Sequence, residues 1–338
     1  IVRESGGQPV TVSVVPNDNF FSVSNFRYYA VRDGLPLTIT RAWDDYPVKI
    51  DFILLKTGDQ GPAFSLAKPG RIMARIEAGD PPFEKAFPII GEFPLPDGSR
   101  AYVRKRSLAA VEGVTPEAMA RRFEAGARQF LGRFAREVEG LEIRFASTPG
   151  ELLRGGIDRI QVSAGKATVG EFSIKRPPLT IRDVRFTLEG LRVNPHRLLT
   201  TGEVEPLEIG RLLVHHLVVT EEDLRAFLSG QPRLTGLRVR LEDGSAAVEL
   251  RQPGPDLNAR LRFVVPGPLG AAFGLEVEAV RLGGFPLPDG LTHWVVRHYD
   301  PAPRLSKLPV TVRLEPVSIR TGRIEIGALD GSLRRRLE

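Results

Sequence analysis

The pattern of apolar residues changes near residue 110, and this change constrains the fold more than any other feature of the sequence. Before it, short apolar runs alternate with turns and loops, as in a small α/β domain. After it come one amphipathic helix and then a long series of segments in which apolar and polar side chains alternate, the pattern of half-buried strands. The sequence therefore predicts two domains, over residues 1–108 and 109–338.

The first domain has the pattern of a Rossmann-like α/β fold. Short, continuous apolar strands separated by a helical segment favour a mainly parallel sheet. The expected strands are Val10–Val15, Leu35–Ile39, Phe52–Lys56, Phe87–Phe93 and Arg100–Lys105, with a helix within Phe20–Ala30. Neither G-x-G-x-x-G nor a P-loop follows the first strand, so no nucleotide fingerprint is present.

A long helix opens the second domain. Thr115-Pro116-Glu117 is a typical helix start, with a hydroxyl cap, a proline in the first turn and an acid against the dipole. Gly140 is expected to end the helix. Spacings of three and four residues place the apolar positions on one face: Met119, Phe123, Ala127, Phe130, Phe134 and Val138.

Strand patterns fill most of the remaining chain and predict a large, curved, mostly antiparallel sheet. They cover residues 141–145, 157–164, 167–174, 179–193, 207–219, 234–241, 246–250, 257–264, 275–282, 310–314 and 323–326. Glu242-Asp243-Gly244 predicts a hairpin turn. Thr220-Glu221-Glu222-Asp223 predicts a short capped helix, Asn194-Pro195 a helical turn, and Pro286–Asp300 a further short helix.

The residues that would carry chemistry are few. The absence of cysteine excludes a disulfide framework and a thiolate metal site. His215 and His216 are neighbours in a strand, so they point to opposite faces and cannot chelate one ion together. Asp44 and Asp45 are paired in a predicted loop, where capping or solvation is the expected role. The sequence therefore predicts no catalytic residue, no metal ligand and no cofactor.

The net charge of +6 admits two interpretations, an anionic partner or a solvated surface. Most arginines occupy the polar positions of alternating strands, as in Leu237-Arg238-Val239-Arg240-Leu241. This favours a solvated strand face, and no aromatic interleaving indicates nucleic acid. No run approaches the roughly 18 apolar residues of a membrane span. The chain begins with Ile1, so we expect it to be a piece of a longer protein.

Several motifs of the first domain occur in the order found in a known family. They are Pro16-Asn17-Asp18-Asn19, Tyr28-Tyr29-Ala30, Phe52 to Pro62 and Phe93-Pro94-Leu95-Pro96-Asp97-Gly98-Ser99. In this order they resemble the soluble C-terminal domain of bacterial family 39 glycosyltransferases, of the dolichyl-phosphate-mannose type. The resemblance implies an extracytoplasmic domain of a membrane enzyme that uses a polyprenyl-phosphate sugar donor. The family's catalytic acids lie in its membrane-embedded half, so none is carried over.

The second domain resembles another family. The motifs are Gly155-Gly156-Ile157-Asp158-Arg159-Ile160, Leu188 to Asn194, Val218 to Leu224, Leu241-Glu242-Asp243-Gly244 and a closing segment from Val317 to Gly327. They resemble the LmeA-like phospholipid-binding family, related to the tubular lipid-binding (TULIP) proteins. The resemblance implies a curled sheet against a long helix, enclosing an apolar groove for acyl chains.

These patterns predict a non-catalytic, extracytoplasmic segment of a membrane glycosyltransferase whose second domain binds a lipid. The lipid is expected to be a phospholipid or a polyprenyl-phosphate derivative, and the parent protein is expected to be tethered to the membrane through its missing N-terminal portion. The predicted lipid-contacting residues are Met119, Phe123, Phe130, Phe134, Ile160, Leu224 and Phe227. An alternative is a cell-envelope interaction scaffold with a filled core; an enzyme would need a cleft with perturbed carboxylates.

Overall fold

The computed structural model describes residues 1–41, 46–62, 69–170, 178–229, 236–250, 256–264, 274–286 and 310–327. The chain forms two compact units, each described by itself below. Unit 1 comprises residues 1–127, 147–158 and 190–209, and unit 2 comprises residues 128–146, 159–189 and 210–338. No helix within these described ranges is long and apolar enough to span a membrane.

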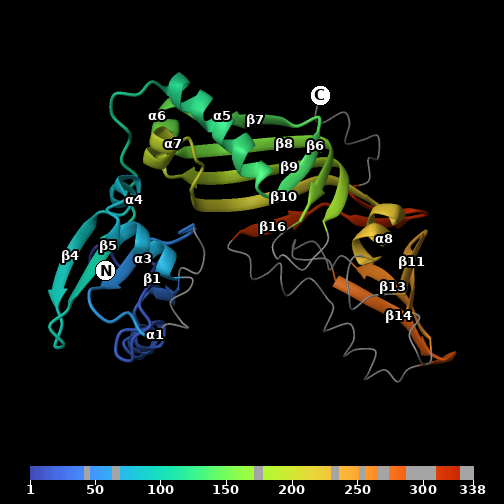
Figure 1. The fold of residues 1–338 in the computed structure, drawn as a ribbon, viewed down its shortest axis with the longest axis horizontal. Helices are drawn as coiled ribbons and strands as arrows, with labels where there is room; N and C mark the ends of the chain where they lie inside the picture. Colours follow the sequence, from blue (N-terminus) through green and yellow to red (C-terminus); the bar gives the residue numbers. More distant parts are fainter. Residues whose placement is uncertain are drawn as a thin grey trace. The chain divides into compact units, whose positions relative to one another are not determined.

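Unit 1 is built on a five-stranded mixed sheet with the order β2-β1-β3-β5-β4 (Figure 1). The strands are β1 (Val10–Val14), β2 (Leu37–Thr40), β3 (Phe52–Lys56), β4 (Ile89–Pro94) and β5 (Arg100–Lys105). β1 pairs in parallel with β2 and β3, whereas β5 runs antiparallel to β3 and to β4. The prediction of a mainly parallel sheet therefore holds only for three strands, because residues 95–99 join β4 and β5 as a hairpin.

Both faces of this sheet are buried, which explains the continuous apolar run of β3. Phe52 and Leu54 belong to one core cluster with α1 (Val23–Arg32). Ile53 and Leu55 belong to a second cluster, with residues of α3 (Pro69–Glu77) and α4 (Pro81–Ala86). Leu207, far along the chain, completes the second cluster. A strand covered on both sides needs apolar residues at consecutive positions.

A buried lysine fixes the turns at one end of the sheet. Lys56 Nζ lies 2.7 Å from a carboxylate oxygen of Asp18 and 3.0 Å from one of Asp97. Hydrogen bonds from Ser99, together with the Lys56 ammonium, hold the pKa of Asp97 well below its usual range. The turn at 57–61 follows β3, and Gln60 Nε2 of this turn donates a hydrogen bond to the Lys56 carbonyl oxygen at 2.7 Å, which gives the turn a structural role.

Three further helices belong wholly or largely to unit 1: α5 (Pro116–Gly132), α6 (Pro149–Leu153) and α7 (Pro195–Thr201). The predicted turn at Asn194-Pro195 is confirmed, because the Asn194 side chain accepts hydrogen bonds from the backbone of His196 and Arg197. Gly126 of α5 is buried and packs closely against the residues that follow α7. A Cβ atom at Gly126 would lie 2.5 Å from the carbonyl oxygen of Gly202.

We expect Gly126→Ala to destabilise unit 1 by about 1–3 kcal/mol, the usual cost of overpacking. The added methyl group would also lie 3.1 Å from Val204 and 3.2 Å from Leu198. The clash outweighs the gain in helix propensity, which is about 1 kcal/mol. The matched control is Gly132→Ala, where the added methyl group meets no atom within 4 Å. Urea unfolding followed by circular dichroism measures both, and equal midpoints for the two variants would contradict the prediction.

Unit 2 contains a sheet with the strand order β17-β18-β10-β9-β8-β6, in which β16 also pairs with β10 and β7 with β8. β8, β9 and β10 contribute residues to both units and run side by side (Figure 1). The strands are β6 (Ala135–Glu139), β7 (Glu142–Ala146), β8 (Gly156–Val169), β9 (Leu179–Val193), β10 (Pro206–Thr220), β16 (Thr311–Leu314), β17 (Val317–Arg320) and β18 (Arg323–Ile326). β18 runs antiparallel to β10 and β17, and β6 and β7 run antiparallel to β8, whereas β16 runs parallel to β10, so the predicted mostly antiparallel sheet is confirmed.

Two sequence predictions are wrong in this sheet. The long helix ends at Gly132 instead of Gly140, because residues 135–139 leave it to pair with β8 as strand β6. Phe134 and Val138 therefore lie outside the helix. The strand predicted at 157–164 and the beginning of the one predicted at 167–174 form one continuous strand, β8, since Gly165 and Lys166 continue the ladder without a turn. Residues 171–174 lie outside the described residues.

A second sheet of unit 2 has the order β11-β12-β13-β14-β15 and is antiparallel throughout. Its strands are β11 (Leu237–Glu242), β12 (Ser245–Leu250), β13 (Leu257–Val264), β14 (Gly274–Leu282) and β15 (Phe285–Pro286). The predicted hairpin at residues 242–244 is confirmed, with Glu242 opposite Ser245. Helix α8 (Glu221–Ser229) packs on one face of this sheet, where Leu224 meets Val239, Leu241, Ala246 and Ile319. The helix predicted at 286–300 lies outside the described residues from position 287 onward. The paired acids Asp44 and Asp45 lie outside them as well.

The predicted cap of α8 is confirmed. The Thr220 hydroxyl accepts a hydrogen bond from the backbone N–H of Asp223 at 3.1 Å. The Asp223 carboxylate in turn accepts two hydrogen bonds from Arg182 of β9, at 2.8 and 3.0 Å. The bond to Arg182 is the largest cause that lowers the pKa of Asp223. This pair anchors α8 to β9 within unit 2.

Candidate functional site

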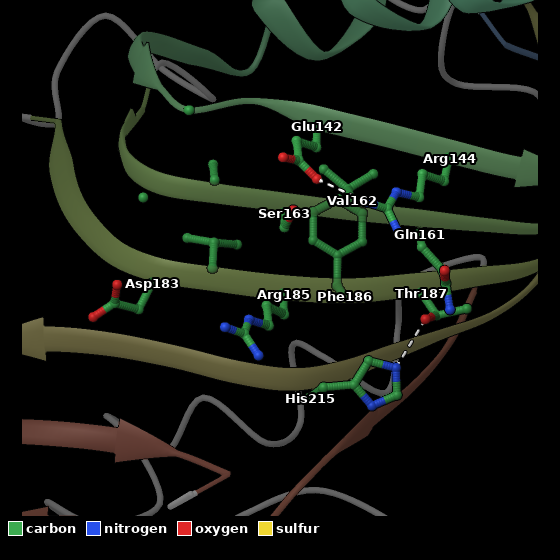
Figure 2. A pocket seen from close by; sticks show the side chains of 14 residues that line it. Glu142, Arg144, Gln161, Val162, Ser163, Asp183, Arg185, Phe186, Thr187 and His215 are labelled. Carbon is green, nitrogen blue, oxygen red and sulfur yellow. Dashed lines mark hydrogen bonds and ion pairs between the residues drawn. The ribbon is translucent and has the colours of Figure 1, made fainter. Parts of the chain in front are cut away.

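An open groove of about 510 Å³ lies on the sheet of unit 2, and it is the candidate site (Figure 2). Strands β7, β8, β9 and β10 and the turn before β7 supply the residues that line it. They are Gly140, Glu142, Arg144, Gln161, Val162, Ser163, Ala164, Gly165, Asp183, Val184, Arg185, Phe186, Thr187 and His215. All of them belong to unit 2, so the groove is complete within one compact part of the molecule.

The pairing of β7 with β8 sets the polar residues of the groove beside one another. Glu142 stands opposite Ser163, and Arg144 stands opposite Gln161. Residues directly opposite each other in an antiparallel pair point to the same face. Glu142 and Arg144 form an ion pair at 3.4 Å, but both side chains are largely exposed, so the pair adds little stability. Arg144 is therefore available to an anionic ligand.

An irregularity in β9 brings apolar side chains and a further arginine to the groove. Asp183 has a φ of +50°, in the left-handed region that non-glycine residues rarely adopt. Beyond it Val184 is buried, Arg185 is exposed and Phe186 is partly buried. Figure 2 shows the Phe186 ring in the middle of the groove, near Val162. A local kink of this kind re-aims side chains, and such kinks are common at functional sites.

The groove has an apolar strip and a cationic margin. The strip is formed by Phe186, which is partly buried, together with the buried side chains of Val162, Ala164 and Val184. Arg144 and Arg185 stand beside it, and His215 Nε2 lies 2.8 Å from the Thr187 hydroxyl. The planar fork of a guanidinium matches the oxygens of a phosphate. The arrangement is thus suited to an amphiphile, whose hydrocarbon part lies on the strip and whose anionic head meets the arginines.

The described residues give little support to metal binding. Within those ranges no group of three or more histidine, aspartate or glutamate side chains is placed to hold a metal ion. His216 is buried, and its Nδ1 atom lies 2.7 Å from the carbonyl oxygen of Gly327. His215 has a different partner, the Thr187 hydroxyl. The two rings have different partners, as the sequence predicts for neighbours in a strand. His293 and His298 lie outside the described residues.

None of the seven residues predicted to contact lipid is among the residues that line this groove. Met119 and Phe123 are buried in the part of α5 that belongs to unit 1. Phe130 and Phe134 are partly buried in unit 2, with ring centroids 5.1 Å apart. Ile160 is buried in β8, opposite Phe145. Their lipid contact stays a prediction, since none of the seven lines the groove.

The two predicted residues of α8 also stand away from the groove. Leu224 packs against the core cluster shared with β11, β12 and β17. Phe227 is partly buried in the same helix. Sequence reasoning missed the groove residues themselves, above all Arg144, Arg185 and Phe186. The available signal was the alternation of arginine with apolar residues along β9, but it does not say which face is open.

Comparison with known proteins bears directly on this part of the chain. Residues 109–328 match the model of a family described as LmeA-like phospholipid-binding. The match contains every residue of the groove and covers nearly two thirds of the chain. No curated protein and no solved structure matches the chain. On the family match, the chain belongs to the LmeA-like phospholipid-binding family.

Proposed function

We propose that the protein binds a phospholipid in the groove between β7 and β10. The observation that carries this proposal is an apolar strip beside two arginines, inside a segment that matches a phospholipid-binding family. Burial of an acyl chain is favourable by about 0.8 kcal/mol per methylene. The phosphate would meet Arg144 and Arg185, because hydrogen bonds between a guanidinium and a phosphate are among the strongest in proteins.

Native mass spectrometry of the purified protein, followed by lipid extraction, tests this proposal. We expect co-purified phospholipid in the wild type. Phe186→Ser and Arg185→Gln should each weaken lipid binding by about tenfold, since each removes one apolar or one charge-assisted contact. Matched controls are Phe20→Ser and Arg121→Gln, two exposed residues outside the groove. A protein that carries no lipid and takes up none from phospholipid vesicles would contradict the proposal.

The finer assignment concerns the parent protein and its location. We propose that the chain is a non-catalytic, extracytoplasmic segment of a membrane glycosyltransferase, and that a polyprenyl-phosphate derivative is a second class of lipid to test. The motifs of residues 16–105 that resemble family 39 glycosyltransferases support this assignment. The purified chain should therefore show no sugar transfer from a polyprenyl-phosphate donor. Transfer by this chain alone would overturn the assignment.

A second candidate function, that of an interaction scaffold, is favoured by the apolar surface of unit 1. A groove of about 400 Å³ there is lined almost wholly by apolar side chains. Tyr29, Leu35 and Phe93 line it and are 50%, 37% and 54% exposed. Exposed apolar patches of this kind commonly mark contact sites for other molecules. A mass without lipid, together with loss of complex formation in Phe93→Ser, would favour this candidate.

A further inference from the structure

The outer face of the β11–β15 sheet carries a series of arginines brought together by strand register. Arg238 of β11 stands opposite Glu249 of β12, which stands opposite Asn258 of β13. Asn258 in turn stands opposite Arg281 of β14. Residues paired in this way share a face of the sheet. Arg238 and Arg281 therefore lie on one face and in one row across the strands.

The next row on this face adds two more arginines. Arg240 stands opposite Ala247, and Ala247 stands opposite Arg260. All four arginine side chains are exposed. A groove of about 390 Å³ lies over the Arg238 and Arg240 end, where Arg225 of α8 also lines it. Figure 1 shows α8 next to β11, and the two elements are in contact.

Acidic neighbours neutralise only part of this charge. Arg260 pairs with Glu242 at 3.3 Å, and Arg225 pairs with Glu221 at 2.7 Å. The side chains of Arg238, Arg240 and Arg281 form no ion pair or hydrogen bond with any residue in the described part of the chain. Among the described residues, three guanidinium groups thus stand unpaired on an exposed sheet face, with Glu249 as the acid of the Arg238 row, and this excess of positive charge attracts an anionic surface.

The same end of the sheet carries exposed hydrocarbon. Leu282 and Phe285 face each other across the Gly283-Gly284 turn that joins β14 to β15, and both glycines have positive φ. Leu282 is 40% exposed and Phe285 is 78% exposed. Leu282 is in register with the ends of β13, β12 and β11, and it directly follows Arg281. An apolar hairpin tip therefore lies one residue beyond the arginine row, at the end of the sheet, with Leu282 on the face opposite to that of Arg281.

We infer that this end of the sheet, defined by Arg238, Arg240, Arg281, Leu282 and Phe285, docks on a bilayer that contains anionic phospholipid. A bilayer offers phosphate groups above hydrocarbon, and the surface offers arginines beside an apolar tip. Aromatic residues are favoured at the membrane–water interface, and basic residues near it attract anionic lipids. A nucleic acid or an acidic protein would meet the arginines but would leave Phe285 in water.

Vesicle flotation with the full chain tests the docking surface. The vesicles are phosphatidylglycerol mixed with phosphatidylcholine, and pure phosphatidylcholine is the reference. Each arginine replaced, in the series Arg238→Gln, Arg240→Gln and Arg281→Gln, should weaken binding to the anionic vesicles about fivefold. Leu282→Ser with Phe285→Ser should weaken it as well, with less dependence on salt. The controls Arg121→Gln and Phe20→Ser should bind as the wild type does.

A single fluorophore reports insertion of the tip. The chain has no cysteine, so Phe285→Cys carries one environment-sensitive label. We expect a blue shift with anionic vesicles and none with dextran sulfate, a soluble polyanion. Equal binding to dextran sulfate, with no effect of the Leu282 and Phe285 changes, would overturn the inference and assign the face to polyanions generally.

Docking and lipid holding are separable in this design. Tip variants should lose vesicle binding while they keep the lipid detected by native mass spectrometry. A wild type that docks without holding lipid would contradict the proposed function alone. A wild type that holds lipid but does not float with anionic vesicles would contradict the docking surface alone.

Discussion

Replacing Glu205 by Ala is expected to lower the free energy of unfolding by about 3–5 kcal/mol, the usual cost of breaking a buried ion pair. The Glu205 side chain is only 3% exposed and lies 2.6 Å from Nη1 of Arg75. It also accepts a hydrogen bond from Asn194 Nδ2 at 2.7 Å, and Arg197 lies nearby. Without Glu205 these partly buried cations lose one carboxylate and keep their ion pairs with Asp80.

Urea unfolding followed by circular dichroism measures this effect. Glu112→Ala serves as the matched control, because Glu112 is an exposed acid of the same unit. The free energy of unfolding of Glu112→Ala should stay within about 0.5 kcal/mol of that of the wild type. Glu205→Gln should fall between the two, since an amide keeps one acceptor but not the charge. A Glu205→Ala variant as stable as the control would mean that water or a rearranged Asp80 replaces the carboxylate.

Phe123→Ala should destabilise the protein by a similar amount, about 3–5 kcal/mol, because truncation of a buried aromatic leaves a cavity. Phe123 is 1% exposed on α5. The prediction concerns delipidated protein and is measured by urea unfolding. Phe20→Ala is the control, because Phe20 is 89% exposed and its loss should be nearly neutral. A change below about 1 kcal/mol would mean that the site collapses around the smaller side chain.

The same variant tests the predicted lipid contact of Phe123. A ligand that binds the folded protein raises its free energy of unfolding by an amount that grows with the logarithm of the ratio of ligand concentration to Kd. If Phe123 contacts the lipid, added phospholipid should raise the unfolding midpoint of the wild type more than that of Phe123→Ala. Equal shifts would assign Phe123 to the protein core alone.

Elements with strong local signals were predictable from the sequence. The bounds of β3, β5, β9, β13 and β18 agree with the apolar patterns, and the turn at Asp243-Gly244 agrees with its chemistry. The end of α5 was not predictable, because the apolar stripe continues through Phe134 in helical spacing. Residues 135–139 instead pair with β8, and such a long-range pairing leaves no local trace in the sequence.

The sequence predicts the class of ligand for the candidate site, but not the residues that line the groove. The alternating strands indicate a sheet with one apolar face, and the motifs indicate a lipid. Which side chains line a groove depends on register and on local kinks, and a shift of one residue exchanges the two faces. The backbone of Asp183 is such a kink, and aspartate at that position carries no signal of it. The apolar stripe of the helix is visible in the sequence, which therefore indicates Met119 and Phe123 and not Arg185 and Phe186.

The position of Leu207 in the core of unit 1 has a consequence for biosynthesis. Its side chain completes the cluster built by Ile53, Phe83 and Phe87, and its carbonyl oxygen accepts a hydrogen bond from the Lys49 N–H at 2.7 Å. A ribosome must therefore translate past residue 207 before this core can close. Until then the nascent chain exposes the apolar face of β3, where chaperones that recognise unfolded segments would bind. Excising the family-matched segment from residue 109 onward would likewise leave Leu207 without Ile53, Phe83 and Phe87, and Glu205 without Arg75.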